Sequence, residues 1–84
     1  MYKLVWKDEA LDDLDKIDRV IAQKLFTKIE TYLVKNPTEY GKPLIGNLKG
    51  LWSYRFSNYR IIYQLKQTEL LITVVAIAHR RKVY

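Results

Sequence analysis

The first third of the chain changes from a two-residue to a 3.6-residue apolar spacing. Residues 2–6 (YKLVW) place Tyr2, Leu4 and Trp6 on one side and predict a first strand. Two apolar stripes at helical spacing follow, and the second ends before Pro37, because the residue preceding a proline is disfavoured in helical geometry. The predicted buried positions are Ala10, Leu11, Leu14 and Ile17 in the first helix, and Ile21, Leu25, Ile29, Tyr32 and Leu33 in the second.

Aspartates mark where both helices are expected to begin. Asp8 is the predicted N-cap of the first helix and Asp18 that of the second, since their carboxylates can accept hydrogen bonds from free amides of the first turn. We interpret the remaining acidic residues of this half as a solvated helix face.

Strand patterns dominate the second half of the chain. Residues 38–50 hold all three glycines and the second proline and predict an irregular loop. Residues 51–56, 59–65 and 70–77 then read as strands joined by hairpin-sized links. The last of them (LLITVVAI) is almost continuously apolar, which is typical of an interior strand covered on both faces. The order is β-α-α-β-β-β, and it predicts one α+β domain over residues 1–84, with two N-terminal helices packed on a small, antiparallel-rich twisted sheet.

The first hairpin has an unusual charge arrangement. A two-residue turn at Ser57-Asn58 places Arg55 directly opposite Arg60, on one face of the strand pair. The other face carries the predicted core side chains Trp52, Tyr54, Phe56, Tyr59, Ile61 and Tyr63. Facing like charges cost a few tenths up to about 1 kcal/mol, so a compensating role is expected.

Two interpretations of this arginine pair remain open. Guanidinium groups fork onto phosphate oxygens and stay charged at any relevant pH, so the pair can form an anion site. Alternatively, each arginine reaches a separate carboxylate on the acidic first helix.

Charge is divided unevenly between the two halves. The net charge is +6, but residues 1–39 carry seven basic and eight acidic residues, whereas residues 40–84 carry eight basic residues and Glu69. Such a basic half attracts polyanions, with nucleic acid as the expected partner, although a general solubility charge is the alternative. The chain lacks cysteine and has a single histidine, which excludes disulfides and ordinary zinc sites, so we expect no metal and no cofactor. The N-terminus has no apolar run of signal-peptide type and no segment reaches membrane-spanning length, so we expect a cytoplasmic protein without membrane contact.

The C-terminal residues 78–84 (AHRRKVY) form the second concentration of candidate chemistry. Metal-free cleavage of a phosphodiester needs cations for the phosphoryl oxygens and groups that move protons. The arginines supply the first requirement, and His79 or Tyr84 could supply the second. In RNA the 2′-hydroxyl can act as the nucleophile, so no covalent enzyme residue is required.

Residues 48–63 (LKGLWSYRFSNYRIIY), followed one strand later by residues 79–84 (HRRKVY), resemble the RelE/ParE superfamily of toxin–antitoxin toxins. In that family an LxG-x-(W/Y)-x-x-R segment precedes a YRxxY strand, and an HRRxVY-like ending closes the sheet. The order of elements and the length also suit the family over the whole chain.

The resemblance implies a specific activity and specific site residues. RelE-like members are ribosome-dependent endoribonucleases that cut messenger RNA in the A site without a metal. By resemblance, Arg60 stabilises transition-state charge, Arg55 occupies the basic position of the preceding strand, and Tyr84 stacks on or orients the base. His79 belongs to the basic C-terminal cluster. The expected RNA- or phosphate-binding residues are Lys49, Arg80, Arg81 and Lys82. The expected partners are the ribosome, messenger RNA and a cognate antitoxin, whose acidic segment would wrap the toxin in a hetero-oligomer.

The chain also departs from the family pattern at two positions. Ser53 stands where one RelE branch has a second catalytic lysine, and Asn47 stands where the YoeB-like branch has a glutamate base. Proton transfer is therefore assigned among His79, Tyr84 and Lys49. Two alternatives to the nuclease remain: a ParE-like inhibitor of DNA gyrase, and a catalytically weak nucleic-acid-binding relative.

Overall fold

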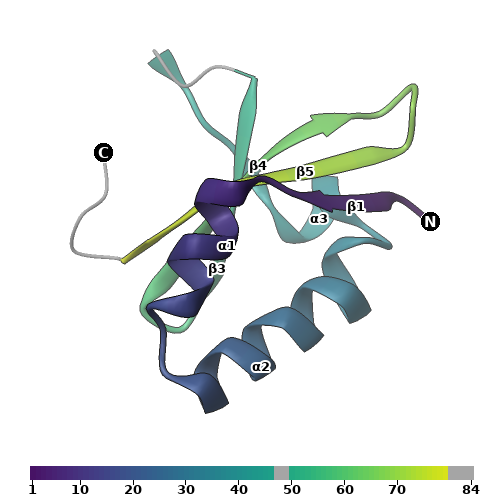
Figure 1. Ribbon diagram of the computed structural model, residues 1–84. Helices are drawn as coiled ribbons and strands as arrows, with labels where there is room; N and C mark the ends of the chain where they lie inside the picture. The colour runs from purple at the N-terminus through teal and green to yellow at the C-terminus, as the bar shows by residue number, and fades with distance from the viewer. Residues whose placement is uncertain (47–49, 80–84) are drawn as a thin grey trace.

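A five-stranded sheet carries two N-terminal helices on one of its faces (Figure 1). The computed structural model describes residues 1–46 and 50–79 of the 84. The sheet order is β1-β5-β4-β3-β2, in which β1 pairs with β5 in parallel and the other neighbours are antiparallel. The helices and strands are β1 (Lys3–Trp6), α1 (Asp8–Asp15), α2 (Arg19–Lys28), a π-helical turn η1 (Ile29–Leu33), α3 (Pro37–Tyr40), β2 (Lys42–Pro43), β3 (Leu51–Phe56), β4 (Tyr59–Lys66) and β5 (Leu71–His79). The α+β class predicted from the sequence is confirmed.

The core lies between the helices and one face of the sheet, which we call the helix face. Leu25, Ile29 and Leu33 are fully buried at the period of one continuous helix through α2 and η1. They pack with the sheet side chains Ile61, Tyr63, Ile72, Val74 and Ile77. Trp52, Tyr54, Phe56 and Tyr59 are partly buried against the same cluster, so the core face predicted for the hairpin is confirmed.

The structure corrects three predictions about the helix caps and the buried positions. Asp18 caps α2 as predicted, accepting hydrogen bonds from the amides of Val20 and Ile21. Lys7, and not Asp8, is the N-cap of α1, and Asp8 occupies the first turn instead. Leu11 and Tyr32 were predicted to be buried but are about 42% and 41% exposed. Leu11 lies beside the core-facing positions Ala10 and Leu14 of α1, and the ring of Tyr32 packs against Lys28 and Tyr40.

The predicted loop after α2 contains regular structure. Pro37 opens the short helix α3, and β2 then pairs with β3, so that Lys42 lies opposite Ser53 and Pro43 opposite Trp52. Gly41 connects α3 to β2 and lies next to the Tyr63 hydroxyl. This hydroxyl donates a 2.6 Å hydrogen bond to the Pro37 carbonyl. The sequence did not predict β2, because two residues are too few to show an alternating pattern.

β5 is interior to the sheet, as predicted, but its two faces differ. Ile72, Val74 and Ile77 are buried on the helix face, whereas the intervening residues are half-exposed. The other face of β5 is therefore only partly covered, and the described helices α1 and α2 pack on the helix face. A β-bulge interrupts the alternation, because Ile62 pairs with Ala76 while the next residue, Tyr63, pairs with Val74.

Candidate anion site on the sheet

The arginine pair forms as the sequence predicts. β3 and β4 are joined by the turn Ser57-Asn58, and Arg55 lies directly opposite Arg60. Both side chains belong to the face of the sheet opposite the helices, which we call the open face. Arg55 is exposed and Arg60 is half-buried.

A small pocket lies at this pair. Its volume is about 140 Å³, and it is lined by Tyr40, Lys42, Ser53, Arg55 and Arg60. Three of the five lining side chains are cationic, one carries a phenol and one carries a hydroxyl. All five can donate hydrogen bonds and none is acidic, which suits a phosphate group.

Arg60 has unused hydrogen-bonding capacity. Its Nε is buried, and among the described residues it has no hydrogen-bond partner. A buried donor without a partner costs about 1–3 kcal/mol, and functional sites are where such a cost is retained. Phosphate oxygens would satisfy this donor.

The alternative interpretation of the arginines is not supported by the described residues. α1, with its acidic side chains, packs on the other face of the sheet, and no ion pair between Arg55 or Arg60 and a carboxylate is found in residues 1–46 and 50–79. The pair therefore remains a concentrated positive charge on the open face.

His79 lies away from this pocket. It pairs with Tyr59 across the strands, and the two rings meet edge to face at 5.3 Å on the helix face. It borders a separate hollow of about 410 Å³ with Asp13 of α1 and with Lys16 and Ile17, which follow that helix. The β-bulge reverses the alternation of β5 before His79, so this side chain belongs to the helix face and not to the face that carries the arginines.

The other predicted site residues cannot be placed. Lys49, Arg80, Arg81, Lys82 and Tyr84 lie outside the described residues, as does Asn47. Their assignments stay predictions.

Lys42 and Tyr40 were missed by the sequence reasoning. Both lie in the segment interpreted as an irregular loop, and neither belongs to a motif. Lys42 reaches the pocket through its pairing with Ser53, and Tyr40 is placed by α3, with its ring 5.7 Å from that of Tyr32. The basic character of residues 40–84 was the available signal, but it does not single out Lys42.

Two tyrosines on the helix face of the sheet, Tyr54 and Tyr63, have raised pKa values. Burial raises the pKa of Tyr63 far above the usual value of 10. Burial also raises the pKa of Tyr54, and the nearby Tyr40 and Tyr32 add to that rise. Both phenols are therefore neutral near pH 7, and they serve packing and hydrogen bonding.

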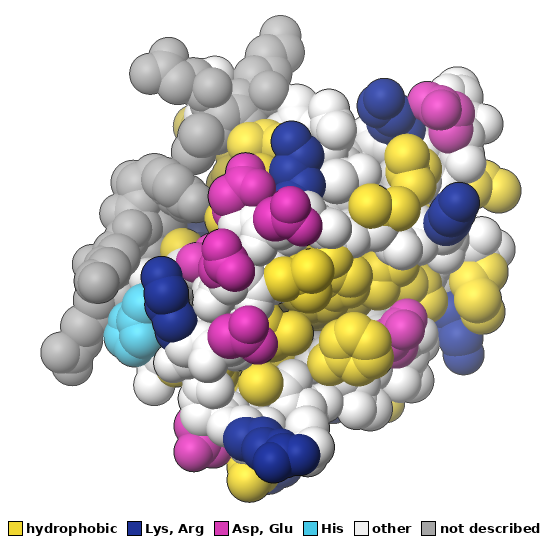
Figure 2. Space-filling view, in the orientation of Figure 1, with side chains coloured by type: hydrophobic (Ala, Val, Ile, Leu, Met, Phe, Trp, Pro, Cys, Tyr) yellow, Lys and Arg dark blue, Asp and Glu magenta, His cyan; other side chains and the backbone are white. Residues whose placement is uncertain are grey.

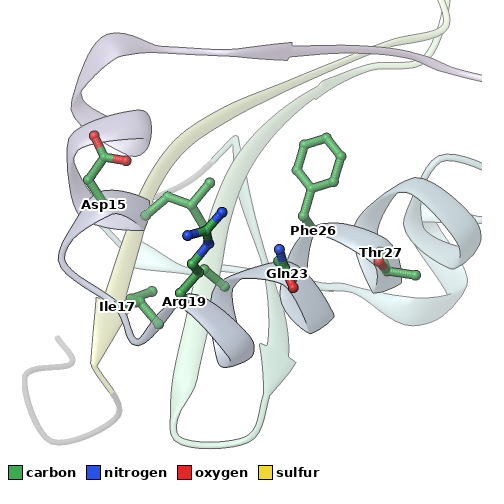
Figure 3. A pocket seen from close by; sticks show the side chains of 8 residues that line it. Asp15, Ile17, Arg19, Gln23, Phe26 and Thr27 are labelled. Carbon is green, nitrogen blue, oxygen red and sulfur yellow. The ribbon is translucent and has the colours of Figure 1, made fainter.

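A larger groove lies between α1 and α2, away from the arginines. It encloses about 680 Å³, and Asp15, Arg19, Gln23, Phe26 and Thr27 are among its lining residues (Figure 3). Figure 2 shows apolar side chains gathered on this face beside the acidic side chains of α1. The groove has no cluster of like-charged donors, so we place the candidate chemistry at the smaller pocket.

Two further findings concern metals and membranes. No group of three or more metal-ligating His, Asp or Glu side chains occurs among residues 1–46 and 50–79. Within the same ranges, none of the helices has the length and apolar character needed to cross a membrane.

The chain is similar in sequence to known toxins. A family model described as the ParE toxin of the type II toxin–antitoxin system parDE matches residues 4–84. Toxin RelE of Mycobacterium tuberculosis is 32% identical over 75 residues, covering 89% of this chain and 77% of the relative. Toxin RelG of the same organism is 31% identical over 83 residues, covering 99% of this chain and 95% of the relative.

The solved structures agree in fold. A chain of the toxin–antitoxin complex RelBE2 from M. tuberculosis superimposes with a TM-score of 0.89 at 26% identity, covering 94% of this chain and 98% of that one. The isolated RelE toxin of E. coli gives a TM-score of 0.78 at 19% identity, with 99% and 88% covered.

Proposed function

Since this chain belongs to the RelE/ParE superfamily of type II toxin–antitoxin toxins, we propose that it is a ribosome-dependent endoribonuclease that cleaves messenger RNA in the A site. The observation that supports this proposal is the pocket on the open face, where Arg55 and Arg60 face each other and the buried Nε of Arg60 has no hydrogen-bond partner among residues 1–46 and 50–79. The curated relatives with 32% and 31% identity carry RelE and RelG toxin names, which favours the RelE-like activity.

The reaction requires little chemistry from the protein itself. The 2′-oxygen attacks the adjacent phosphorus, the bond to the 5′-oxygen breaks, and the products are a 2′,3′-cyclic phosphate and a 5′-hydroxyl. One proton leaves the 2′-hydroxyl and one reaches the departing 5′-oxygen. Negative charge grows on the phosphoryl oxygens, and Arg60 and Arg55 stabilise it as fixed donors.

Proton transfer is assigned to the C-terminal residues by resemblance. Tyr84 and the basic residues Arg80, Arg81 and Lys82 would complete the site, together with Lys49. His79 would contribute from the flank beside Tyr59, and not from within the arginine pocket.

An antitoxin is the proposed protein partner. The solved relatives include toxin–antitoxin complexes from M. tuberculosis and E. coli. Because the described residues that line the arginine pocket include three cations and no carboxylate, a carboxylate-rich segment of an antitoxin lying across the open face would neutralise it. The toxin released from such a hetero-oligomer would act in the cytoplasm, where translating ribosomes are found.

Primer extension tests the nuclease directly. One messenger RNA is incubated with the purified protein, with and without translating ribosomes, and compared with Arg60→Ala and the surface control Lys35→Ala. We expect the wild type and Lys35→Ala to cut the messenger RNA in step with the reading frame, and to do so only when ribosomes are present. Loss of one oxyanion-stabilising group lowers such rates by about 10²–10³-fold, so Arg60→Ala should cut far more slowly. Unchanged cutting by a folded Arg60→Ala would overturn the site assignment.

A gyrase inhibitor is the second candidate, because the matching family model describes a ParE toxin. In that case the wild type would produce no cuts with or without ribosomes, and it would inhibit supercoiling by purified gyrase. Growth arrest would then persist in Arg60→Ala.

A further inference from the structure

The short strand β2 brings a third cation to the arginine pocket. Lys42 lies directly opposite Ser53. Two residues later, the Leu44 amide donates a 2.9 Å hydrogen bond to the Leu51 carbonyl. Directly opposed residues of an antiparallel pair project from the same face of a sheet. The side chain of Lys42 is therefore on the open face with Arg55 and Arg60, and all three line the same pocket.

Ser53 leaves room for this convergence. It is 7% exposed, lies between Lys42 and Ile62 in the sheet, and forms the floor of the pocket. Its side chain is among the smallest available, so cations from β2, β3 and β4 can approach one volume of about 140 Å³. A long side chain at this position would occupy that volume.

Contacts with Pro37 and Tyr63 fix the position of the segment that carries Lys42. The Gly41 amide donates to the Pro37 carbonyl at 3.2 Å, and the same carbonyl accepts the Tyr63 hydroxyl at 2.6 Å. An added Cβ at Gly41 would lie 2.8 Å from the ring carbon Cζ of Tyr63, so the backbone passes directly over this buried ring. These contacts fix the start of β2 although the strand has only two residues.

A reacting phosphate gains negative charge during cleavage. A phosphodiester carries one negative charge, and the pentacoordinate species formed by attack of the 2′-oxygen carries two. Groups that interact more strongly with the second than with the first accelerate the chemical step. A third cation placed beside the arginine pair would meet this additional charge.

We propose that Lys42 is a catalytic residue, which contacts a phosphoryl oxygen of the RNA and stabilises the charge that develops during cleavage. The inference rests on the proposed nuclease function, and it assigns a role to a residue outside the motifs that identify the family.

Single-turnover cleavage on ribosomes separates a catalytic role from a binding role. The variants are Lys42→Ala and Lys42→Arg, with Lys35→Ala as the control, because Lys35 is exposed and lines no part of the pocket. We expect Lys42→Ala to lower the rate constant at saturating ribosomes by at least tenfold, while the half-saturating ribosome concentration changes by less than threefold. Lys42→Arg should recover part of the rate. An unchanged rate in Lys42→Ala, with Arg60→Ala inactive, would overturn the role of Lys42 and leave the proposed function standing.

Anion binding provides a readout that needs no nuclease activity. Inorganic phosphate is titrated into the 15N-labelled protein, and the Ser53 and Arg60 amide resonances are followed. We expect these resonances to shift in the wild type and Lys35→Ala, with at least fivefold weaker binding in Lys42→Ala. If the wild type cuts no RNA but shows this pattern, the proposed function fails and Lys42 remains part of an anion site. Absence of a phosphate-dependent shift in the wild type, or equal binding by Lys42→Ala, would overturn the inference.

Discussion

The small size of Gly41 determines how closely the backbone approaches the sheet. Its φ of −99° and ψ of 170° are open to any residue, so glycine is required by space and not by backbone conformation. A Cβ at this position would overlap the Tyr63 hydroxyl. The close approach of α3 and β2 to the sheet therefore depends on the missing side chain.

Gly41→Ala should destabilise the protein by about 1–3 kcal/mol, the usual cost of overpacking a tight site. Urea unfolding measures the change. In a Tyr63→Phe background the same substitution should cost less, because the nearest overlapping atom is gone. Equal costs in the two backgrounds would show that the Tyr63 hydroxyl is not the obstacle.

Tyr63 predicts a loss of stability in alkaline solution. Its pKa is raised in the folded protein because the phenol is buried, whereas in the unfolded chain it is about 10. The unfolded state therefore releases this proton first, so the stabilisation is fully present below pH 10 and declines as the pH rises above it.

Urea midpoints at pH 9, 10 and 11 test this prediction. The midpoint of the wild type should fall more steeply than that of Tyr63→Phe over this range. Tyr2→Phe, which removes a half-buried phenol at the edge of the sheet, serves as the control and should follow the wild type. Parallel curves for the wild type and Tyr63→Phe would contradict the assignment.

Among the elements, α1 protects an edge of the sheet. β1 pairs with β5 from Leu71 to Val74, and in the described part of the chain no strand pairs with the later part of β5 on that side. The Asp13 carboxylate accepts a 3.0 Å hydrogen bond from the Ile77 amide across this gap. Asp13 is thus an exception to the interpretation of the acidic residues as a purely solvated helix face.

Asp13→Ala should lower the free energy of unfolding by about 1–3 kcal/mol, since the Ile77 amide loses a charged acceptor in a partly buried position. Asp12→Ala removes an exposed carboxylate from the same helix and should change stability by less than about 0.5 kcal/mol. Hydrogen exchange at Ile77 should accelerate in the first variant only. Similar effects of the two substitutions would mean that the hydrogen bond contributes little.

The hairpin of β3 and β4 carries an electrostatic cost in the free protein. Arg55 faces Arg60, and facing like charges destabilise a strand pair by up to about 1 kcal/mol. Arg55→Thr should therefore raise the thermal midpoint, since threonine also suits a strand. The gain should shrink as sodium chloride is raised, because salt screens the repulsion in the wild type. A lower midpoint for Arg55→Thr at low salt would show that the pair is not a net cost.

At the scale of the whole molecule, the sheet separates two kinds of surface. The helix face carries the core and the groove between α1 and α2, and the open face carries Lys42, Arg55 and Arg60. This division predicts where a polyanion binds.

A short single-stranded RNA added to the 15N-labelled protein should shift the amide resonances of Ser53, Arg55 and Arg60. The resonances of Val20 and Gln23, on α2, should stay in place. Binding should weaken with added salt, because phosphate contacts release counterions. Shifts confined to α2 would place the nucleic acid on the wrong face and contradict the proposed site.

Local sequence determined the elements and the arginine pair. The alternation of residues 51–63 and a two-residue turn fixed the register that joins Arg55 to Arg60, because the opposed residues are only five positions apart. The apolar period and Asp18 likewise fixed α2, whose cap and hydrogen bonds lie within one turn. Such interactions leave a pattern in neighbouring residues, which is why they could be predicted.

Only the tertiary structure decided which side chains share the pocket. Lys42 meets Ser53 through a strand too short to show a pattern, and Tyr63 reaches Pro37 across 26 positions. The bulge opposite Ile62 reverses the alternation of β5 and turns His79 to the helix face. Without the bulge, strict alternation from Val74 would place His79 on the open face, with the arginines. These outcomes depend on packing between segments distant in the chain, and no single segment of the sequence contains the information.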